Sequence, residues 1–262
     1  MPEPGYTPAE IMTVAAARKL KNGTVCFVGI GLPSAAANLA RITHAPELVL
    51  IYESGTIGAK PDVLPLSIGD GELAETADTV VSVPEIFRYW LQGGRVDIGF
   101  LGAAQIDKLG NINTTVIGPY EKPKVRLPGA GGAPEIATAA KEVAIILKQS
   151  KRAFVEKLDF VTSSGYYRSA SGNGRPGPRG RGPTTVITDL GVLRSDPITR
   201  ELILTAIHPG TTVDQVREAT GWQLKVAPNL ETTSLPTDPE LRALRDLHSR
   251  TAAAHGNVSV AE

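Results

Sequence analysis

Short apolar runs without polar alternation are the feature that most constrains how this sequence can fold. Residues 48–52, Leu-Val-Leu-Ile-Tyr, contain no charged or amide position, and residues 24–28 and 143–147 are also largely apolar. A strand with one face in water alternates apolar and polar residues, whereas a strand buried on both faces is apolar throughout. These runs therefore predict strands in the interior of a parallel sheet.

Helical segments separate the apolar runs along the chain. We expect strands over residues 24–28, 48–52, 79–83, 96–101, 112–117, 143–147, 154–161, 185–188, 202–207 and 222–226. We expect helices over residues 9–20, 84–91, 134–140, 213–220 and 239–249, and another that opens at Pro33-Ser34. Strands that alternate with helices are typical of a doubly wound α/β fold. The predicted fold class is α/β, with an open, mostly parallel sheet flanked by helices.

The chain is expected to form one domain, because its 262 residues contain no internal repeat and no convincing linker. Residues 1–250 would form this domain, and residues 251–262 a flexible C-terminal tail. Residues 163–183 differ from the rest, with six glycines, three prolines and four arginines. Such a segment buries little apolar surface, so we expect an exposed, mobile loop. It is either a flexible insertion or a basic flap over phosphates or over a partner subunit.

Charge and composition argue against several classes of function. Lys plus Arg and Asp plus Glu each number 27, a balance that gives no indication of binding to nucleic acid or to an anionic membrane. Cys26 is the single cysteine and the four histidines are scattered, so neither an internal disulfide nor a metal site is expected. The N-terminus lacks the pattern of a signal peptide, and no apolar run approaches the roughly 20 residues that span a bilayer. We therefore expect a cytoplasmic protein without a bound metal.

Glu53 is the first candidate for chemistry, because it directly follows the apolar run 48–52 and precedes Ser54-Gly55. It would sit at the carboxyl end of a central strand, where open α/β sheets place their ligands. A glutamate side chain is anionic at neutral pH, so it could attack a carbonyl carbon without a helper base. The alternative is a structural glutamate that caps a helix or pairs with an arginine.

Glycine-rich turns follow two other predicted strands. Gly29 and Gly31 precede the helix at Pro33-Ser34, and Gly129-Ala130-Gly131-Gly132-Ala133 precedes the helix at residue 134. Each turn could direct backbone N–H groups at an anion or an oxyanion, or could be an ordinary tight connection. The first turn lacks the third glycine of a dinucleotide-binding fingerprint, which argues against NAD. Gln105, after the strand 96–101, either lines the same cleft or is a surface turn residue.

These features converge on one edge of one predicted sheet. A carboxylate, two glycine-rich helix entries and an amide would meet there, without histidine, cysteine or metal. That set suits a nucleophilic carboxylate assisted by backbone donors, and it suits a Ser-His-Asp hydrolase poorly. The residues alone do not name a substrate.

Taken in order, the motifs resemble those of the beta-type subunits of family I coenzyme A transferases. The likeness runs from residue 9 to about residue 226. Its motifs are Lys21-Asn22-Gly23, Val28-Gly29-Ile30-Gly31-Leu32-Pro33, Glu53-Ser54-Gly55, Gly102-Ala103-Ala104-Gln105-Ile106-Asp107, Gly110-Asn111-Ile112-Asn113, Gly129-Ala130-Gly131-Gly132-Ala133, Phe160-Val161-Thr162-Ser163 and Val186-Ile187-Thr188-Asp189. Each motif is short, but so many in the same order form a strong signal.

The resemblance implies an activity and a role for each candidate residue. Glu53 would take the acyl group from an acyl-CoA, become a glutamyl-CoA thioester and pass CoA to a free carboxylic acid. Gly131 and Gly132 look like oxyanion donors, and Gly29 and Gly31 like part of the wall beside the glutamate. Coenzyme A would be a substrate rather than a permanently bound cofactor, and an alpha-type subunit would complete the active site of a hetero-oligomer.

Two other functions stay open. Some relatives of this fold have lost the glutamate and act as hydrolases or decarboxylases on CoA esters. This chain keeps Glu53, which favours transfer, although the same residue could act as a general base. A metabolite-sensing domain is the non-enzymatic alternative, and the absence of a predicted helix-turn-helix or basic face argues against it.

Overall fold

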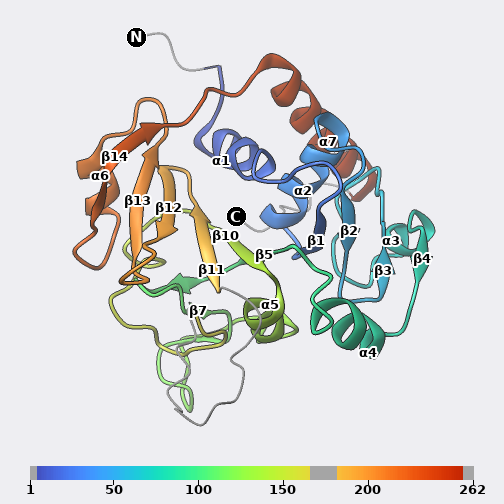
Figure 1. Ribbon diagram of the computed structural model, residues 1–262, viewed down its shortest axis with the longest axis horizontal. Helices are drawn as coiled ribbons and strands as arrows, with labels where there is room; N and C mark the ends of the chain where they lie inside the picture. The colour runs from blue at the N-terminus through green and yellow to red at the C-terminus, as the bar shows by residue number, and fades with distance from the viewer. Residues whose placement is uncertain (1–4, 166–181, 256–262) are drawn as a thin grey trace.

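A ten-stranded sheet forms the centre of the computed structural model, which describes residues 5–165 and 182–255 (Figure 1). The strand order is β14-β13-β12-β11-β10-β5-β1-β2-β3-β4. The strands are β1 (Val25–Val28), β2 (Val49–Ile51), β3 (Thr56–Ile57), β4 (Thr79–Val80), β5 (Ile98–Gly102), β10 (Glu142–Ile146), β11 (Pro183–Ile187), β12 (Gly191–Ser195), β13 (Leu202–Ile207) and β14 (Val226–Thr232). Two small antiparallel pairs lie outside this sheet, β6 (Gln105–Ile106) with β7 (Ile112–Asn113) and β8 (Val116–Ile117) with β9 (Val125–Arg126).

The five strands β11, β10, β5, β1 and β2 are all parallel. Their register aligns the carboxyl ends, since Val28 of β1 pairs with Phe100 of β5, and Ile146 of β10 pairs with Gly102. The antiparallel strands β3, β4 and β12 lie toward the two edges of the sheet. The predicted fold class, an open and mostly parallel sheet flanked by helices, is confirmed.

Helices cover both faces of the sheet, and a separate apolar core lies under each layer. The first layer contains α1 (Pro8–Ala17), α2 (Leu32–Thr43) and α7 (Asp238–His255), which Figure 1 shows together on one side. The second contains η1 (Ile86–Leu91), α5 (Ala133–Ala139) and α6 (Val213–Glu218), with the short α4 (Val83–Glu85) leading into η1. The short α3 (Gly71–Glu75) adds Leu73 to the first core. Coverage of both faces explains why the central strands are apolar throughout.

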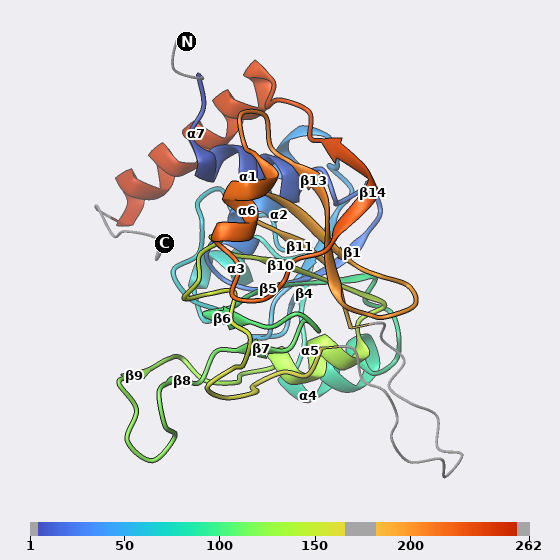
Figure 2. The same cartoon turned by 90° about the vertical axis from the view of Figure 1, so that its left-hand side faces the viewer.

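The first and last helices are joined by an ion pair. The guanidinium of Arg18, just after α1, donates to both carboxylate oxygens of Glu240 in α7, at 2.8 and 2.7 Å. Figure 2 shows α7 lying alongside α1. Burial opposes ionisation of Glu240, but the Arg18 guanidinium and the amide of Thr237 outweigh it and lower the pKa of Glu240 to about 2. This contact fixes the C-terminal helix on the N-terminal one.

Three expected elements differ from the structure. Residues 154–161 form no strand, and Phe154 makes only an isolated bridge with Ile106 while its ring stacks on Trp222. Residues 112–117 split into β7 and β8, because the Asn113 side chain accepts from the amides of Thr115 and Val116 and turns the backbone. The last strand begins only at residue 226, so the expected strand 222–226 is misplaced.

The expected loop and tail are shorter than predicted. Ser163 is buried and bridges Ile112, and Pro183 starts β11, so both ends of the segment 163–183 belong to the fold. Residues 166–181 lie outside the described part of the chain. Residues 251–255, expected in the flexible tail, continue α7, and the Thr251 hydroxyl accepts a hydrogen bond from the amide of Leu64.

No helix within residues 5–165 and 182–255 is both long enough and apolar enough to cross a membrane. The β8–β9 hairpin projects from the body of the molecule in Figure 2.

The Arg18–Glu240 contact predicts a pH-dependent contribution to stability. Because folding depresses the pKa of Glu240, this contribution is fully present above about pH 4.5 and is lost as the pH falls toward 2. Glu240→Gln should lower the free energy of unfolding at pH 7 by about 1–2 kcal/mol, as measured by urea denaturation. The difference from the unmodified protein should shrink below pH 4.5. Asp246→Asn, which breaks the exposed pair with Arg250, is the control and should cost less than about 0.5 kcal/mol. A Glu240→Gln effect as small as that of the control would contradict this role.

Candidate active site

The candidate site lies where the chain connections diverge at the carboxyl edge of the sheet. From β1 the chain passes through α2 on one face to β2, whereas β5 is followed by α5 on the other face before β10. Adjacent strands β1 and β5 therefore feed connections that leave in opposite directions. Open α/β sheets bind ligands in the crevice that such a divergence creates.

Glu53 occupies the tip of a tight turn beside this crevice. The turn is closed by a hydrogen bond from the Gly55 amide to the carbonyl of Tyr52, 3.1 Å, so Glu53 and Ser54 are its two central residues. Gly55 has φ +103°, and a Cβ there would overlap the carbonyl oxygen of Val81. Only glycine fits this position, which is the physical reason for the Glu-Ser-Gly sequence.

A buried polar cluster holds the turn from beneath. The side chain of Tyr52 is fully buried, and its hydroxyl lies 3.1 Å from the hydroxyl of Ser34 and 3.4 Å from the amide nitrogen of Asn38. Burial raises the pKa of Tyr52 to about 12, so the phenol is neutral at physiological pH. Ser34 and Asn38 belong to α2, which begins at the glycine turn after β1. The cluster thus ties the Glu53 turn to the helix beside it.

The glycine-rich loop before α5 reaches the carboxylate directly. The Gly132 amide donates a short hydrogen bond to Oε1 of Glu53. A Cβ on Gly132 would overlap that oxygen and would come within 2.5 Å of the Phe87 ring, and Gly131 has φ +47°. Phe87 lies on η1 and packs against Phe27 of β1, with ring centroids 5.8 Å apart. Glycine is required here because the backbone itself approaches the carboxylate.

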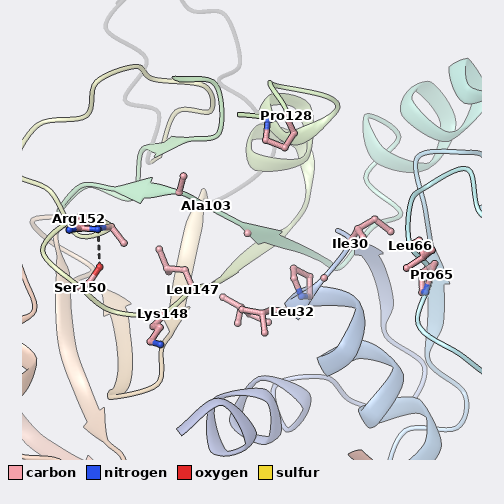
Figure 3. Close-up of a pocket in the computed structure, with 16 residues that line it drawn as sticks. Ile30, Leu32, Pro65, Leu66, Ala103, Pro128, Leu147, Lys148, Ser150 and Arg152 are labelled. Atoms are coloured by element: carbon pink, nitrogen blue, oxygen red, sulfur yellow. Dashed lines mark hydrogen bonds between the residues drawn. The ribbon is translucent and has the colours of Figure 1, made fainter. Parts of the chain in front are cut away.

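Two adjoining cavities open at this edge of the sheet. The smaller, about 430 Å³, is lined by Glu53, Gly29, Thr114 and Gly129 among mostly apolar neighbours. The larger, about 830 Å³, shares the wall formed by Ile30, residues 102–104 and Pro128. Figure 3 shows the two cations of the larger cavity, Lys148 and Arg152, toward one end of it, away from Ile30. Neither cation has an ion-pair partner among the described residues.

The structure brings together most of the candidate residues from the sequence. Gly29 lines the smaller cavity and donates its amide to the carbonyl of Phe100, so it forms part of the wall. Gly31 lines the larger cavity and caps α2 with φ +79°, a conformation that favours glycine. A Cβ on Gly131 would lie 3.5 Å from the Glu53 carboxylate, so Gly131 is adjacent to it. The chemical roles of these glycines stay predictions.

Gln105 is not brought to the cleft. Its side chain is buried and lines neither of the two cavities. Its amide nitrogen donates to Asp159, and its oxygen accepts from Asn113 and from the amide of Asp159. The amide therefore joins β6, β7 and the segment that carries Asp159, and the expectation that Gln105 lines the cleft is replaced by this structural role.

Other reactive side chains in the described residues are unsuited to nucleophilic chemistry. Cys26 is fully buried, and burial raises the pKa of its thiol. Burial lowers the pKa of His208, whose ring nitrogens are engaged by Thr233 and by the carbonyl of Thr188. No group of three or more Asp, Glu, His or Cys residues in the same ranges could hold a metal ion. Glu53 is thus the reactive side chain in the wall of the smaller cavity.

Four residues of the site were not expected from the sequence: Phe87, Thr114, Lys148 and Arg152. A positional signal existed for Lys148, which directly follows the predicted strand 143–147 and so had to lie at the ligand edge. Phe87 and Thr114 carried no such signal, because they come from elements whose approach to Glu53 is set by the tertiary fold.

Comparison with known proteins identifies relatives over nearly the whole chain. The coenzyme A transferase family model matches residues 9–219. The beta-type subunit of the 3-oxoadipate CoA-transferase of Pseudomonas knackmussii is 66% identical over 96% of both chains. The corresponding subunit of the glutaconate CoA-transferase of Acidaminococcus fermentans is 39% identical over 86% of each chain.

Solved structures with the same architecture accompany these sequence relatives. The crystal structure of glutaconate CoA-transferase from Acidaminococcus fermentans matches with a TM-score of 0.83, covering 92% of this chain and 94% of that one. The decarboxylase AibA/AibB matches with a TM-score of 0.79 at 29% identity, covering 94% and 98% of the two chains. The same fold therefore occurs in proteins named for transfer and for decarboxylation.

The close approach of the glycine loop predicts a stability effect. Gly132→Ala should lower the free energy of unfolding by about 1–3 kcal/mol, because the added methyl group overlaps the Glu53 carboxylate and the Phe87 ring. Gly71→Ala is the control, since a Cβ at the start of α3 meets open space, and it should change stability by less than about 0.5 kcal/mol. Urea denaturation of the three proteins measures both effects. Equal stability of Gly132→Ala and the unmodified protein would contradict the described packing.

Proposed function

This chain belongs to the coenzyme A transferase family and is a beta-type CoA-transferase subunit, and on that premise we propose that Glu53 carries the transfer as its nucleophile. The proposal extends to a covalent glutamyl-CoA thioester and to an alpha-type partner that completes the active site. The names of the relatives support the partner, because each name denotes one subunit of a larger enzyme.

The observation that carries the proposal is the position of the Glu53 carboxylate. It forms part of the wall of a largely apolar cavity and accepts a hydrogen bond from the Gly132 amide. A carboxylate needs no base to become a nucleophile, and a backbone N–H beside it can stabilise negative charge that develops on a carbonyl oxygen. Both requirements of attack on a thioester are therefore met within one hydrogen bond of each other.

The proposed reaction is balanced without water or a redox partner. A Glu53 oxygen attacks the thioester carbon, the carbon–sulfur bond breaks and the CoA thiolate leaves, which gives a mixed anhydride. The thiolate then attacks the Glu53 carbonyl, releases the first acid as its carboxylate and forms the glutamyl-CoA thioester. The acceptor carboxylate attacks that thioester, expels the thiolate and forms a second anhydride. Attack of the thiolate on the acceptor carbonyl completes the new acyl-CoA and regenerates Glu53.

The adjoining cavities suit the two ends of an acyl-CoA. The smaller cavity would hold the thioester beside Glu53, and its apolar wall would exclude the water that hydrolyses an anhydride. The larger cavity would hold part of the CoA, with Lys148 and Arg152 facing its phosphates. Neither cation pairs with a carboxylate in the described ranges, which supports this assignment because such cations are available to an anionic ligand.

The substrate pair is proposed from the 66% identity to the 3-oxoadipate CoA-transferase relative. We therefore propose 3-oxoadipate as the acceptor acid and an acyl-CoA of a dicarboxylic acid as the donor. The reaction would take place in the cytoplasm, and the free buried thiol of Cys26 is compatible with a reducing compartment.

Decarboxylation or hydrolysis of a CoA ester is the second candidate, favoured by the structural match to AibA/AibB. Each alternative has its own product in the absence of an acceptor acid, namely carbon dioxide or a free acid with CoA. The assembled enzyme should instead release CoA at less than about one hundredth of its transfer rate without acceptor. Transfer to 3-oxoadipate should exceed transfer to glutaconate at least about tenfold in kcat/KM. Rapid release of CoA without acceptor would favour the second candidate.

Replacement of the nucleophile tests the mechanism. In the enzyme assembled with its alpha-type subunit, Glu53→Gln should lower kcat by at least about a thousandfold, because the amide oxygen is a poor nucleophile. Borohydride reduction of the unmodified enzyme after incubation with acyl-CoA should modify the peptide that contains Glu53. Glu85→Gln, an exposed carboxylate on α4, is the control and should retain full activity. Transfer by Glu53→Gln at a near-normal rate would exclude the mechanism.

The cations of the larger cavity give a separate prediction. Lys148→Ala and Arg152→Ala should each raise KM for acyl-CoA by about threefold to tenfold with little change in kcat, because they would bind the part of the substrate that does not react. Lys151→Ala is the matched control, since this exposed lysine lies between them in sequence but does not line the cavity. Steady-state kinetics measure the effect, and an equal effect of all three substitutions would contradict the assignment.

A further inference from the structure

The glycine loop that reaches Glu53 has little structure of its own. Its residues Gly129 and Gly131 have φ +103° and +47°, conformations that glycine adopts freely. Such a segment loses much conformational entropy when it becomes fixed. A loop that must hold the Gly132 amide on a carboxylate therefore needs an anchor outside itself.

Thr114 supplies that anchor by binding both backbone groups of Gly129. The Gly129 amide donates to the carbonyl of Thr114 at 2.8 Å, and the Thr114 hydroxyl donates to the carbonyl of Gly129 at 2.7 Å. The next bond along the loop runs from the amide of Leu127 to the carbonyl of Thr115, 3.0 Å. The loop is thus fixed three residues before the amide that contacts Glu53.

Thr114 is itself held from its other side. Its amide donates to the hydroxyl of Thr162 at 2.9 Å, and this hydroxyl also lies 2.7 Å from that of Thr115. The Thr162 amide donates to the carbonyl of Ile112 in β7, 2.9 Å. A continuous set of hydrogen bonds therefore runs from β7 through Thr162 and Thr114 to the glycine loop. It gives a physical role to the motif at residues 160–163, which the proposed reaction does not use.

We propose that Thr114 is a positioning residue for the transfer reaction. Its hydroxyl fixes Gly129 and so sets where the Gly132 amide meets Glu53 and, later, the developing oxyanion. This inference rests on the proposed role of Glu53 as the nucleophile. Thr114 also lines the smaller cavity, so the anchoring residue and the reacting carboxylate share one wall.

Loss of the hydroxyl should affect the chemical step more than substrate binding. Valine keeps the branched shape of threonine but leaves the Gly129 carbonyl without its donor. A displaced amide weakens an interaction that matters most in the transition state, which lowers kcat while leaving KM largely unchanged. Serine retains the hydroxyl and should restore the contact.

The test compares three variants in the assembled enzyme with acyl-CoA and acceptor acid. Thr114→Val should lower kcat about tenfold to a hundredfold with KM for acyl-CoA within about threefold, and Thr114→Ser should recover to within about threefold of the unmodified enzyme. Thr205→Val is the matched control, because its hydroxyl makes a similar bond to the carbonyl of Val192 in β12 but lies outside the site. Equal loss of kcat in Thr205→Val, or no recovery in Thr114→Ser, would overturn the inference.

The rate at which the Glu53 thioester forms in a single turnover separates this inference from the proposed function. If the unmodified enzyme forms no thioester, the nucleophile assignment fails. If the unmodified enzyme and Thr114→Val form it equally fast, only the positioning role fails. Should Thr114→Val not fold, Thr162→Val is the second variant, since it removes the acceptor for the Thr114 amide. It should slow thioester formation severalfold without changing KM, and an unchanged rate would overturn the inference.

Discussion

The hydrogen bond from the Gly132 amide to the Glu53 carboxylate is the contact on which the rest of the site depends. It joins two loops from opposite faces of the sheet, because the Glu53 turn packs against α2 and the glycine loop leads into α5. Their meeting requires strands β1, β2 and β5 to end at the same edge, which the parallel register ensures. A fold with alternating strand directions would place these loops at opposite ends of the sheet.

The site combines a charged group with an environment that disfavours charge. The wall of the smaller cavity is mostly apolar, and Glu53 is half-buried within it. Transfer of a carboxylate into such surroundings is costly unless hydrogen bonds compensate. The backbone donor is suited to this task, since it stabilises negative charge and leaves the carboxylate free of a fixed ion pair. The surrounding polar contacts, at Tyr52 and Thr114, position backbone rather than substrate.

Much of the fold followed from the sequence because the central strands are apolar on both faces and short turns end them. The same pattern placed Glu53 and the glycine turns at the ligand edge. Segments with mixed composition were harder, as residues 154–161 illustrate: buried Phe154 and Leu158 gave a strand-like pattern, but the backbone pairs only at one bridge. Gln105 was misassigned because its distance from a strand end does not reveal that Asn113 and Asp159 use its amide. Thr114 depends on contacts between segments far apart in sequence, which no local pattern encodes.

The fate of the carboxylate oxygens of an acceptor acid labelled with oxygen-18 tests the central claim most directly. If Glu53 forms an anhydride with each acid in turn, one labelled oxygen remains on its side chain when the new acyl-CoA leaves. Mass spectrometry of the peptide that contains residue 53 should then detect the label after turnover, and the acid released from the donor should acquire it in later cycles. Label that reaches the released acid while this peptide stays unlabelled would show direct transfer between the two acids, and would contradict a covalent role for Glu53.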